Sequence, residues 1–379
     1  MPAGAITTLQ DVDDLIRGLT LFGTGGGGRP EVGRRLLGEH VRAGRAVGWV
    51  DVESLPDTAQ SACVFGMGSS APTRTLDRAE RAKLGYGDPI DDRPMVEAVR
   101  LLDRATGRRT EVLVPFELGA GNTGGPLDAG ATLGLPVVDA DYAGRAIPEL
   151  SQTLAAIHGI PFWPGAIVDA WGNRLVFESA PSLAVAERVG KMISTVTRLP
   201  DPTLTCAHAG FAVPVGELRR VVVPGSLSRA FRLGRAIREA RDAGRDPVAA
   251  AAAALGGFLL FTGVVTAKPW ESRDGYMFGE TTIAGDGAHA GQALRIWFQN
   301  ENHVAWRDGV VLATSPDLIM VLGRGGEPYT NTMLAEGTAV AVLAAAAHPR
   351  LRKPRALALL GPAHYGFDIP YVPIEERLR

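Results

Sequence analysis

The sequence is poor in cysteine, in net charge and in long apolar runs. Cys63 and Cys206 are its only cysteines, which excludes a disulfide framework and any four-cysteine zinc or iron–sulfur site. Its 39 basic and 41 acidic side chains leave a net charge of −2. The chain therefore lacks the basic surface expected of a protein that binds nucleic acid or an anionic membrane. The longest apolar run, near residues 248–265, is divided by Gly256-Gly257 and predicts a helix followed by a strand, not a membrane span.

The first eight residues contain neither a basic segment nor a long apolar segment, so they do not resemble a secretory signal. We expect a cytoplasmic homo-oligomer that binds a small molecule and neither nucleic acid nor membrane. At about 150 residues per domain, 379 residues predict two domains. With 46% hydrophobic residues, the chain can bury a core that needs no disulfide bonds or metal ions to stabilise it.

The first half alternates between helix and strand patterns. Thr8 and Asp11 form a capping pair ahead of an apolar stripe that predicts a helix over residues 8–22. Further helices are expected at 30–41, 94–102 and 126–133, and strands at 46–52, 62–67, 111–116 and 136–140. This alternation predicts an α/β N-terminal domain over residues 1–178 with a mostly parallel sheet.

The second half has a different pattern. Helices are expected at 184–196 and 227–240. From Leu259 onward, short alternating apolar runs are separated by turn residues such as Arg307-Asp308-Gly309, which predicts a hairpin. We therefore expect a β-rich α+β C-terminal domain over residues 179–379.

A glycine-rich loop follows the first helix. Gly23 stands where a left-handed residue would end that helix, and Thr24 and the run Gly25-Gly26-Gly27-Gly28 come next. Successive glycines allow backbone amides to converge on an anion, so Thr24, Gly25, Gly26 and Gly27 are candidate substrate-binding residues. The alternative is a tight turn between two helices. The loop is neither a Walker A motif nor a dinucleotide fingerprint, because no Lys-Ser/Thr follows it and no strand precedes it.

Two further candidates follow the strand expected at 111–116. Glu117 lies just past its carboxyl end, and Asn122 lies at the start of the next helix. Ligands of open α/β sheets bind outside the carboxyl ends of strands, so Glu117 is a candidate catalytic base and Asn122 a candidate binding residue. The alternative is a helix cap at Asn122 and a solvated Glu117.

A charged cluster follows the strand expected at 136–140. Asp139 and Asp141 share one side of a strand, and Arg145 and Glu149 are spaced four residues apart. Such a cluster can keep one carboxyl protonated and another ionised, as acid–base catalysis requires. Asp139, Asp141 and Arg145 are therefore candidate catalytic residues, and Glu149 a binding residue. A structural ion-pair network is the alternative.

Two weaker signals lie in the second half. Asn300 and Glu301 belong to a polar run after an aromatic strand, which is typical of a hairpin turn but can also line a pocket. Cys206 and His208 would point to one face of a strand, as a thiolate–imidazole couple, half a metal site or core residues. We expect no metal or cofactor, although a divalent metal on Asp139, Asp141 and His208 stays open.

Together these blocks resemble the S-methyl thiohydantoin desulfurase-like family through nearly the whole chain. The resemblance rests on eight blocks of sequence, at 23–28, 115–122, 136–150, 234–237, 275–279, 298–302, 316–319 and 361–368. The chain departs from the family at Ala120, where members usually carry glycine, and at residues 69–74, which lack an acid–lysine pair.

The resemblance implies a two-domain protein that releases methanethiol hydrolytically from an S-methylated thiohydantoin. The two departures point to a branch that acts on a different small ring or amide-like molecule. We therefore expect a hydrolase of a small polar heterocycle. The alternatives are a non-catalytic module that binds a small molecule and a metal-dependent cyclic-amide hydrolase.

Overall fold

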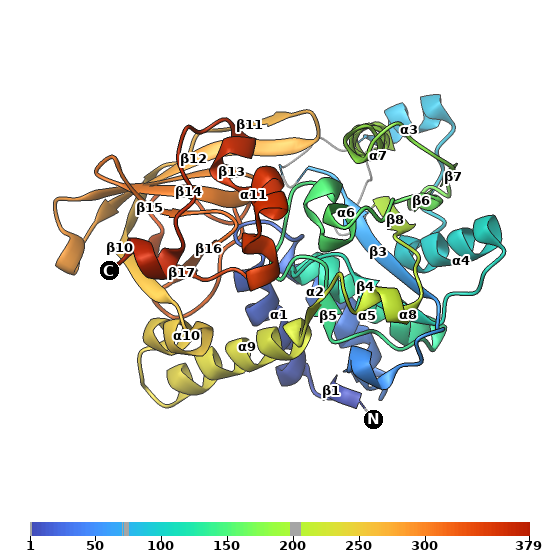
Figure 1. The fold of residues 1–379 in the computed structure, drawn as a ribbon, viewed down its shortest axis with the longest axis horizontal. Coiled ribbons are helices and arrows are strands. Elements are labelled where there is room, and N and C mark those ends of the chain that lie inside the picture. Colours follow the sequence, from blue (N-terminus) through green and yellow to red (C-terminus); the bar gives the residue numbers. More distant parts are fainter. Residues whose placement is uncertain (1, 70, 72–75, 198–205) are drawn as a thin grey trace.

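The computed structural model describes residues 2–69, 71, 76–197 and 206–379. Ser70 and residues 72–74, part of the segment that departs from the family pattern, lie outside this range. Two sheets dominate the molecule: a mixed sheet built mainly from the first half of the chain, and an antiparallel sheet from the second half (Figure 1). The domain boundary at residue 178 stays a prediction.

The first sheet has the strand order β4-β3-β8-β6-β7. β3 (Ser61–Met67) pairs in parallel with β4 (Val112–Pro115) but antiparallel with β8 (Cys206–Gly210). β8 pairs antiparallel with β6 (Gly165–Val168), which forms a hairpin with β7 (Arg174–Phe177). The expectation of a mostly parallel sheet was therefore wrong: the β6–β7 hairpin and β8, which follows the helix α7 (Leu183–Thr197), add three antiparallel pairings to one parallel pairing.

Smaller pairings extend this layer. β1 (Pro2–Ile6) and β2 (Val47–Val50) form an antiparallel pair, and single parallel bridges at Val137 and Val138 connect β4 to β2. The strand expected at 136–140 is thus reduced to these bridges, followed by the short β5 (Ala140–Asp141), which pairs with β9 (Val223–Pro224).

The second sheet is antiparallel throughout, in the order β15-β14-β13-β12-β10-β17-β16, with β11 paired to β12. Because β14 also contacts β16, the sheet curls into a half-barrel. The predicted turn at Arg307–Gly309 is confirmed: it joins β14 to β15, with positive φ at Asp308 and Gly309. The strands are β10 (Phe258–Ala267), β11 (Trp270–Arg273), β12 (Tyr276–Gly285), β13 (Ala293–Gln299), β14 (Glu301–Arg307), β15 (Val310–Thr314), β16 (Leu318–Gly323) and β17 (Ala339–Ala345).

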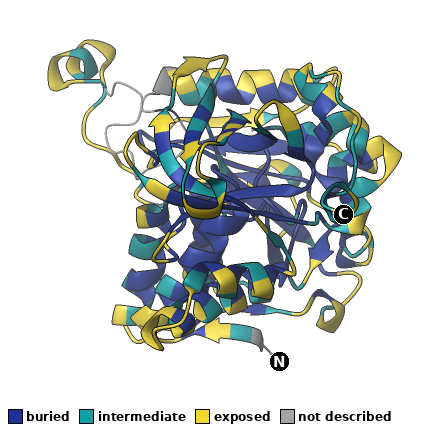
Figure 2. Ribbon diagram, turned by 90° about the vertical axis from the view of Figure 1, so that its left-hand side faces the viewer, coloured by how far each residue is buried: buried dark blue, intermediate teal, exposed yellow. Residues whose placement is uncertain are grey.

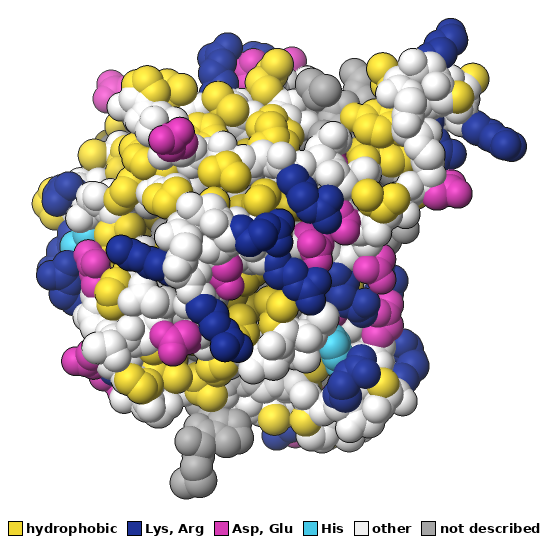
Figure 3. All heavy atoms as spheres, turned by 90° about the vertical axis from the view of Figure 1, so that its right-hand side faces the viewer, with side chains coloured by type: hydrophobic (Ala, Val, Ile, Leu, Met, Phe, Trp, Pro, Cys, Tyr) yellow, Lys and Arg dark blue, Asp and Glu magenta, His cyan; other side chains and the backbone are white. Residues whose placement is uncertain are grey.

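Helices pack beside both sheets, so the strands are mostly buried and the helices expose one face (Figure 2). They are α1 (Leu9–Phe22), α2 (Pro30–Arg42), α3 (Arg78–Leu84), α4 (Pro94–Thr106), α5 (Ala120–Leu133), α6 (Leu154–Ile157), α7 (Leu183–Thr197), α8 (Val215–Leu218), α9 (Ser226–Asp242), α10 (Pro247–Leu255), α11 (Pro354–Leu360) and α12 (Ile374–Arg377). None of the helices in the described residues is long and apolar enough to cross a membrane. On the face drawn in Figure 3, basic and acidic side chains lie interspersed.

The helix α1 confirms its predicted cap, because the Thr8 side chain accepts the Asp11 amide and the Asp11 carboxylate accepts the Thr8 amide. Its end differs from the prediction. Gly23 keeps a right-handed φ of −62°, and the chain becomes left-handed only at Thr24 and Gly25, with φ of 48° and 101°. The glycine-rich loop therefore begins one residue later than expected.

The start of α5 also differs from the prediction, because Pro126 lies inside this helix and not at its first position. Glycine makes the earlier start possible. A Cβ at Gly124 would lie 2.9 Å from the Gly33 Cα, so α2 and α5 approach more closely there than side chains would allow.

Candidate active site

A cavity of about 890 Å³ lies between the two halves of the chain. Its walls come from the glycine-rich loop, the ends of β3 and β4, the start of α5, α7, and the turns before β12 and β14. Among the residues predicted from the sequence, seven line it: Gly25, Gly26, Gly27, Glu117, Asn122, Asn300 and Glu301. The other five, Thr24, Asp139, Asp141, Arg145 and Glu149, are not among the lining residues.

Glu117 is held at the cavity by hydrogen bonds from two directions. Its Oε1 accepts Asn122 Nδ2 at 2.7 Å and its Oε2 accepts the Ile147 amide at 2.7 Å. Asn122 is itself fixed, because its Oδ1 accepts the Gly66 amide of β3 at 3.0 Å. Burial raises the pKa of Glu117 to about 7 in spite of these hydrogen bonds. A carboxyl that titrates near neutral pH can act as a general base or a general acid.

Glu301 faces the same cavity from the first position of β14, and its side chain occupies space that only a glycine leaves open. A Cβ at Gly26 would lie 1.8 Å from the Glu301 Oε1. The Oε2 atom is buried and has no hydrogen-bond partner among the described residues. Burial and the charge of Glu117 raise the pKa of Glu301 well above its usual range. The site therefore combines two buried carboxyls whose pKa values are both raised, that of Glu117 to about 7.

The residue before Glu301 lies in a strained conformation. Asn300 has a φ of 56° and stays in place because its amide donates to the Met277 carbonyl at 2.7 Å and its Oδ1 accepts the Met277 amide at 2.9 Å. Its carbonyl accepts Asn331 Nδ2 at 2.8 Å. A left-handed non-glycine residue persists only where its surroundings fix it, and such residues cluster at functional sites.

The glycine-rich loop connects the two halves through its carbonyls. The Thr24 carbonyl accepts the Asn302 amide at 2.7 Å, and the Gly25 carbonyl accepts the Asn331 amide at 2.7 Å. On the other side, the Gly27 carbonyl accepts the amides of Gly121 and Asn122, each at 3.1 Å. The loop thus holds Glu301 of the second half against the helix start that carries Asn122.

Arg145 is fully buried, and its guanidinium donates to both halves of the chain. Its Nη2 donates to Thr24 Oγ1 at 3.0 Å and to the Asn302 carbonyl at 3.1 Å. Its Nη1 donates to the Pro316 and Asp317 carbonyls at 3.0 and 3.1 Å, and its Nε to the Ala146 carbonyl at 2.9 Å. This guanidinium therefore ties the loop to the second sheet.

The two aspartates of the charged cluster also lie outside the cavity. Asp139 accepts the Ser228 amide at 2.9 Å and the Ser228 hydroxyl at 2.5 Å, in the first turn of α9. Asp141 Oδ2 accepts the amides of Ala143 and Gly144 at 2.9 and 2.6 Å, which closes a turn. Burial raises the pKa of Asp141 to about 7.

The remaining predicted residues are placed as follows. Glu149 lies outside the cavity lining, with its Oε1 atom 3.1 Å from His364 Nε2. Cys206 lines the cavity, and its Sγ lies 3.9 Å from His208 Nε2. Burial raises the pKa of Cys206 to about 12 and lowers that of His208 to about 3, so both are neutral near pH 7. The described residues contain no group of three His, Cys, Asp or Glu side chains suited to a metal ion.

Among the charged lining residues that were not predicted from the sequence, two come from α7. Glu187 and Lys191 lie on one face of α7, with Lys191 Nζ 3.6 Å from Glu187 Oε1. Glu187 Oε2 accepts the Leu150 amide at 2.8 Å, and Tyr276 donates its hydroxyl to Glu187 Oε1 at 3.2 Å. In the sequence these residues belong to an ordinary amphipathic helix, and no motif distinguishes them.

Two family models together match most of the chain. The S-Me-THD-like N-terminal domain matches residues 10–179, and the S-Me-THD-like C-terminal domain matches residues 189–374. The chain belongs to the S-Me-THD-like family. The resemblance inferred from the sequence is therefore confirmed. In this family member, the N-terminal match contains Glu117 and the C-terminal match contains Glu301 and Lys191.

A solved structure shares the fold of this family member over its full length. The crystal structure of a protein from Chromobacterium violaceum has a TM-score of 0.75 and 26% sequence identity, and the match covers 98% of this chain and 100% of that one. No protein with a curated description matches the chain.

Proposed function

We propose that this S-Me-THD-like protein is a hydrolase of a small polar heterocycle, with an S-methylated thiohydantoin as the substrate class that its family name suggests. The observation that carries the proposal is the pair Glu117 and Glu301, two buried carboxyls that face one cavity from opposite halves of the chain. A pair of carboxyls with different proton affinities is the arrangement that acid–base hydrolysis requires.

The proposed reaction begins at the ring carbon that carries the methylthio group. A water oxygen bonds to this carbon while Glu117 accepts a proton from the water. The carbon–nitrogen double bond opens, and the ring nitrogen takes this proton from Glu117. The carbon–sulfur bond then breaks as the new carbonyl forms, the sulfur leaves with the proton of Glu301, and the hydroxyl proton of the adduct passes to Glu301, so both carboxyls return to their starting states. The two protons of the water end on the ring nitrogen and on methanethiol, so the products are a hydantoin and methanethiol.

The hydrogen bonds at Glu117 fit the role of base. Its two acceptor contacts, to Asn122 and Ile147, fix the carboxylate and favour its charged form. Glu301 suits the role of acid because its Oε2 lacks a partner and its pKa is raised by burial. Arg145, Asp139 and Asp141, which do not line the cavity, are proposed to shape the site and not to react.

Release of methanethiol from S-methyl thiohydantoin tests this proposal. Headspace gas chromatography would follow the product for the wild type, Glu117→Gln, Glu301→Gln and a control, Glu280→Gln, whose side chain pairs with Arg295 at the surface of the second sheet. We expect each of the first two variants to lose about 10²–10⁴-fold in kcat/KM, the usual contribution of a positioned acid or base. Turnover near that of the wild type in both, or no turnover by the wild type, would overturn the proposal.

A further inference from the structure

Glu301 lies between two residues that are joined by one buried side chain. Asn300 precedes it and Asn302 follows it in the sequence. Asn331 bridges these two neighbours, because its Nδ2 donates to the Asn300 carbonyl at 2.8 Å and to Asn302 Oδ1 at 3.1 Å. Asn302 is fixed in turn, since its Nδ2 donates to the Ile319 carbonyl of β16 at 3.0 Å. A single amide group therefore holds the residues on both sides of Glu301.

Asn331 is itself fixed in the segment that joins β16 to β17. It is 2% exposed, and its backbone amide donates to the Gly25 carbonyl at 2.7 Å. The glycine-rich loop leaves room for its side chain, because a Cβ at Gly25 would lie 2.4 Å from Asn331 Nδ2. The flanking Thr330 and Thr332 line the cavity, whereas Asn331 is not among the lining residues. Asn331 therefore supports the cavity wall from behind and is not placed to touch a substrate.

The backbone at Asn300 depends on such support. Its φ of 56° is costly for a non-glycine residue and persists only where contacts fix it. Contacts with the Met277 backbone hold its amide and its side chain. Asn331 holds its carbonyl, which belongs to the peptide bond that leads into Glu301. The Glu301 Oε2 atom has no hydrogen-bond partner of its own among the described residues, so the position of this carboxyl depends on the backbone that carries it.

We propose that Asn331 is a positioning residue that holds Glu301 in place as the acid of the proposed hydrolysis. This role deepens the proposed function and rests on it for its catalytic meaning. Removal of the Asn331 side chain takes one donor from both the Asn300 carbonyl and Asn302 Oδ1, so the strained backbone can relax and the carboxyl can move. Because Asn331 does not line the cavity, its effect on the reaction passes through Glu301.

Crystal structures without substrate test the placement. In Asn331→Ala we expect the Glu301 carboxyl to move by about 1 Å or more, a displacement that matters at a reacting group. Asn331→Asp keeps the size of the side chain but lacks the Nδ2 donor, so it should show the same change if the alanine variant fails to fold. Asn173→Ala is the matched control: this asparagine donates to Asp169 Oδ2 at 2.8 Å, outside the cavity lining, and Glu301 should stay in place.

A double-mutant cycle provides the second measurement, with methanethiol release as the readout. Asn331→Ala should lower kcat/KM by about 10²-fold in the otherwise wild-type protein. It should have little further effect when Glu301→Gln is already present, because the acid that it positions is gone. A role in stability alone would give the same factor in both backgrounds.

The outcomes separate the two proposals. A Glu301 carboxyl that keeps its wild-type position in both Asn331 variants, or equal factors in the two backgrounds, would overturn the role of Asn331. A displaced Glu301 in a protein whose wild type hydrolyses nothing would instead overturn the proposed function, and Asn331 would remain the residue that fixes the backbone at Glu301.

Discussion

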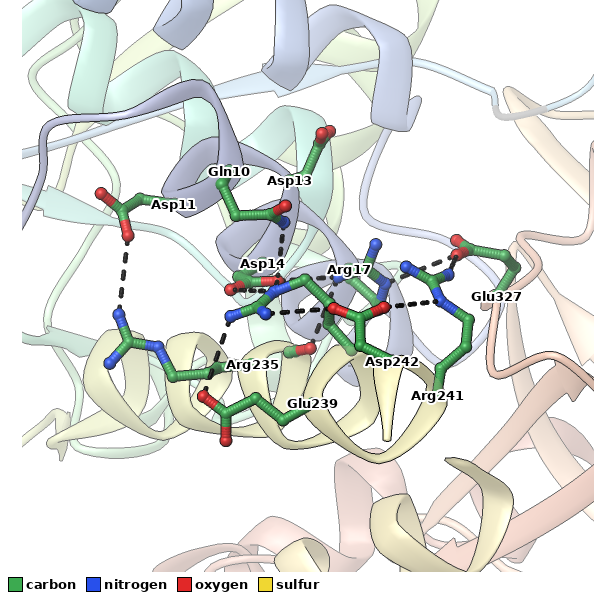
Figure 4. Close-up of polar contacts among 12 residues, drawn as sticks. Gln10, Asp11, Asp13, Asp14, Arg17, Arg235, Glu239, Arg241, Asp242 and Glu327 are labelled. Carbon is green, nitrogen blue, oxygen red and sulfur yellow. Dashed lines mark hydrogen bonds and ion pairs between the residues drawn. The ribbon is translucent and has the colours of Figure 1, made fainter. Parts of the chain in front are cut away.

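Buried carboxylates occur in two regions of this molecule with opposite surroundings. At the interface of α1 and α9, Asp14 Oδ1 accepts Arg17 Nη1 at 2.9 Å and Arg238 Nε at 2.9 Å (Figure 4). In the cavity, Glu301 Oε2 has no partner among the described residues, and no arginine forms an ion pair with Glu117 there. The first carboxylate is paired with arginines of the two helices that it joins. The two cavity carboxyls have no such ion pair among the described residues, and burial raises the pKa of both.

The comparison separates residues that hold the fold together from residues that are available for chemistry. Two helices that approach as closely as α1 and α9, where a Cβ at Gly234 would lie 1.7 Å from the Asp14 carbonyl, bury their polar groups and need compensating partners. A carboxyl without such partners reduces stability but keeps a proton that it can exchange near neutral pH. Strain and unsatisfied groups are expected where function maintains them.

The largest effect on stability is expected from a variant that removes the buried carboxylate of Asp14 at the interface of α1 and α9. Asp14→Ala leaves Arg17, whose side chain is 6% exposed, with only the half-exposed Glu327 at 3.6 Å as a carboxylate partner among the described residues. We therefore expect a loss of about 3 kcal/mol in the free energy of unfolding, at the lower end of the range for a buried charge that loses its partner. Urea denaturation measures it. Asp13→Ala is the matched control on the same helix: its side chain is 47% exposed and pairs with Arg34, so the loss should stay below about 1 kcal/mol. Equal losses in the two variants would remove the distinction.

The second prediction concerns Asp141, which is buried but neutralised by no arginine among the described contacts. Its pKa is about 7 in the folded protein, against an ordinary value of 3.8 for aspartate, so the folded state binds more protons between these two pH values. Its contribution to stability is therefore full below about pH 4 and is lost as pH rises through 7. Asp141→Asn keeps an acceptor for the Ala143 and Gly144 amides.

We expect Asp141→Asn to be more stable than the wild type above pH 7, by a few kcal/mol at most, at about 1.4 kcal/mol per unit of pKa shift. Urea denaturation from pH 5 to 8 should give a flatter dependence on pH than in the wild type. Glu117 adds a slope of the same sign in both proteins, because its pKa is raised as well. Parallel curves for the two proteins would contradict the prediction.

The third prediction sharpens the view of the cavity. Gly26→Ala places a Cβ against Glu301 Oε1, so that carboxyl has to move. A displacement of about 1 Å at a reacting group can lower activity by about 10²-fold, and we expect a loss of that order in kcat/KM with a smaller change in stability. Gly87→Ala is the control, since a Cβ at Gly87 meets nothing within 4 Å. Undiminished turnover in Gly26→Ala would show that Glu301 does not need its present position.

Local patterns were enough for the elements whose causes are local. The cap of α1 at Thr8 and the turn at Asp308-Gly309 were predicted because a few neighbouring residues determine them. The start of α5 was placed at Pro126 because proline favours the first turn of a helix. The structure starts it six residues earlier, where contact with Gly33 of α2 depends on glycine at position 124. Contacts distant in sequence leave no local pattern.

The same difference between local patterns and distant contacts explains which residues of the candidate site could be predicted from the sequence. Glu117 and the glycine-rich loop were found because they follow predicted elements, and both line the cavity. Lys191 was missed because its neighbours, Gly68 and Tyr276, come from distant segments. Arg145 was proposed as catalytic because it belongs to a cluster with Asp139, Asp141 and Glu149, with a structural ion-pair network as the alternative. In the structure its partners are mainly backbone carbonyls, which the sequence pattern does not indicate.

The smallest effect is expected at Asp139. It tests whether this residue stabilises the fold, as Asp14 does, or serves the cavity, as Glu301 does. Asp139 accepts both the amide and the hydroxyl of Ser228, in the first turn of α9, where a carboxylate satisfies an unpaired amide and the positive end of the helix. Asp139→Ala should therefore lower the free energy of unfolding by about 1 kcal/mol, measured by urea denaturation, and leave kcat/KM within about twofold of the wild type. A large loss of activity at unchanged stability would instead place Asp139 among the residues that serve the cavity.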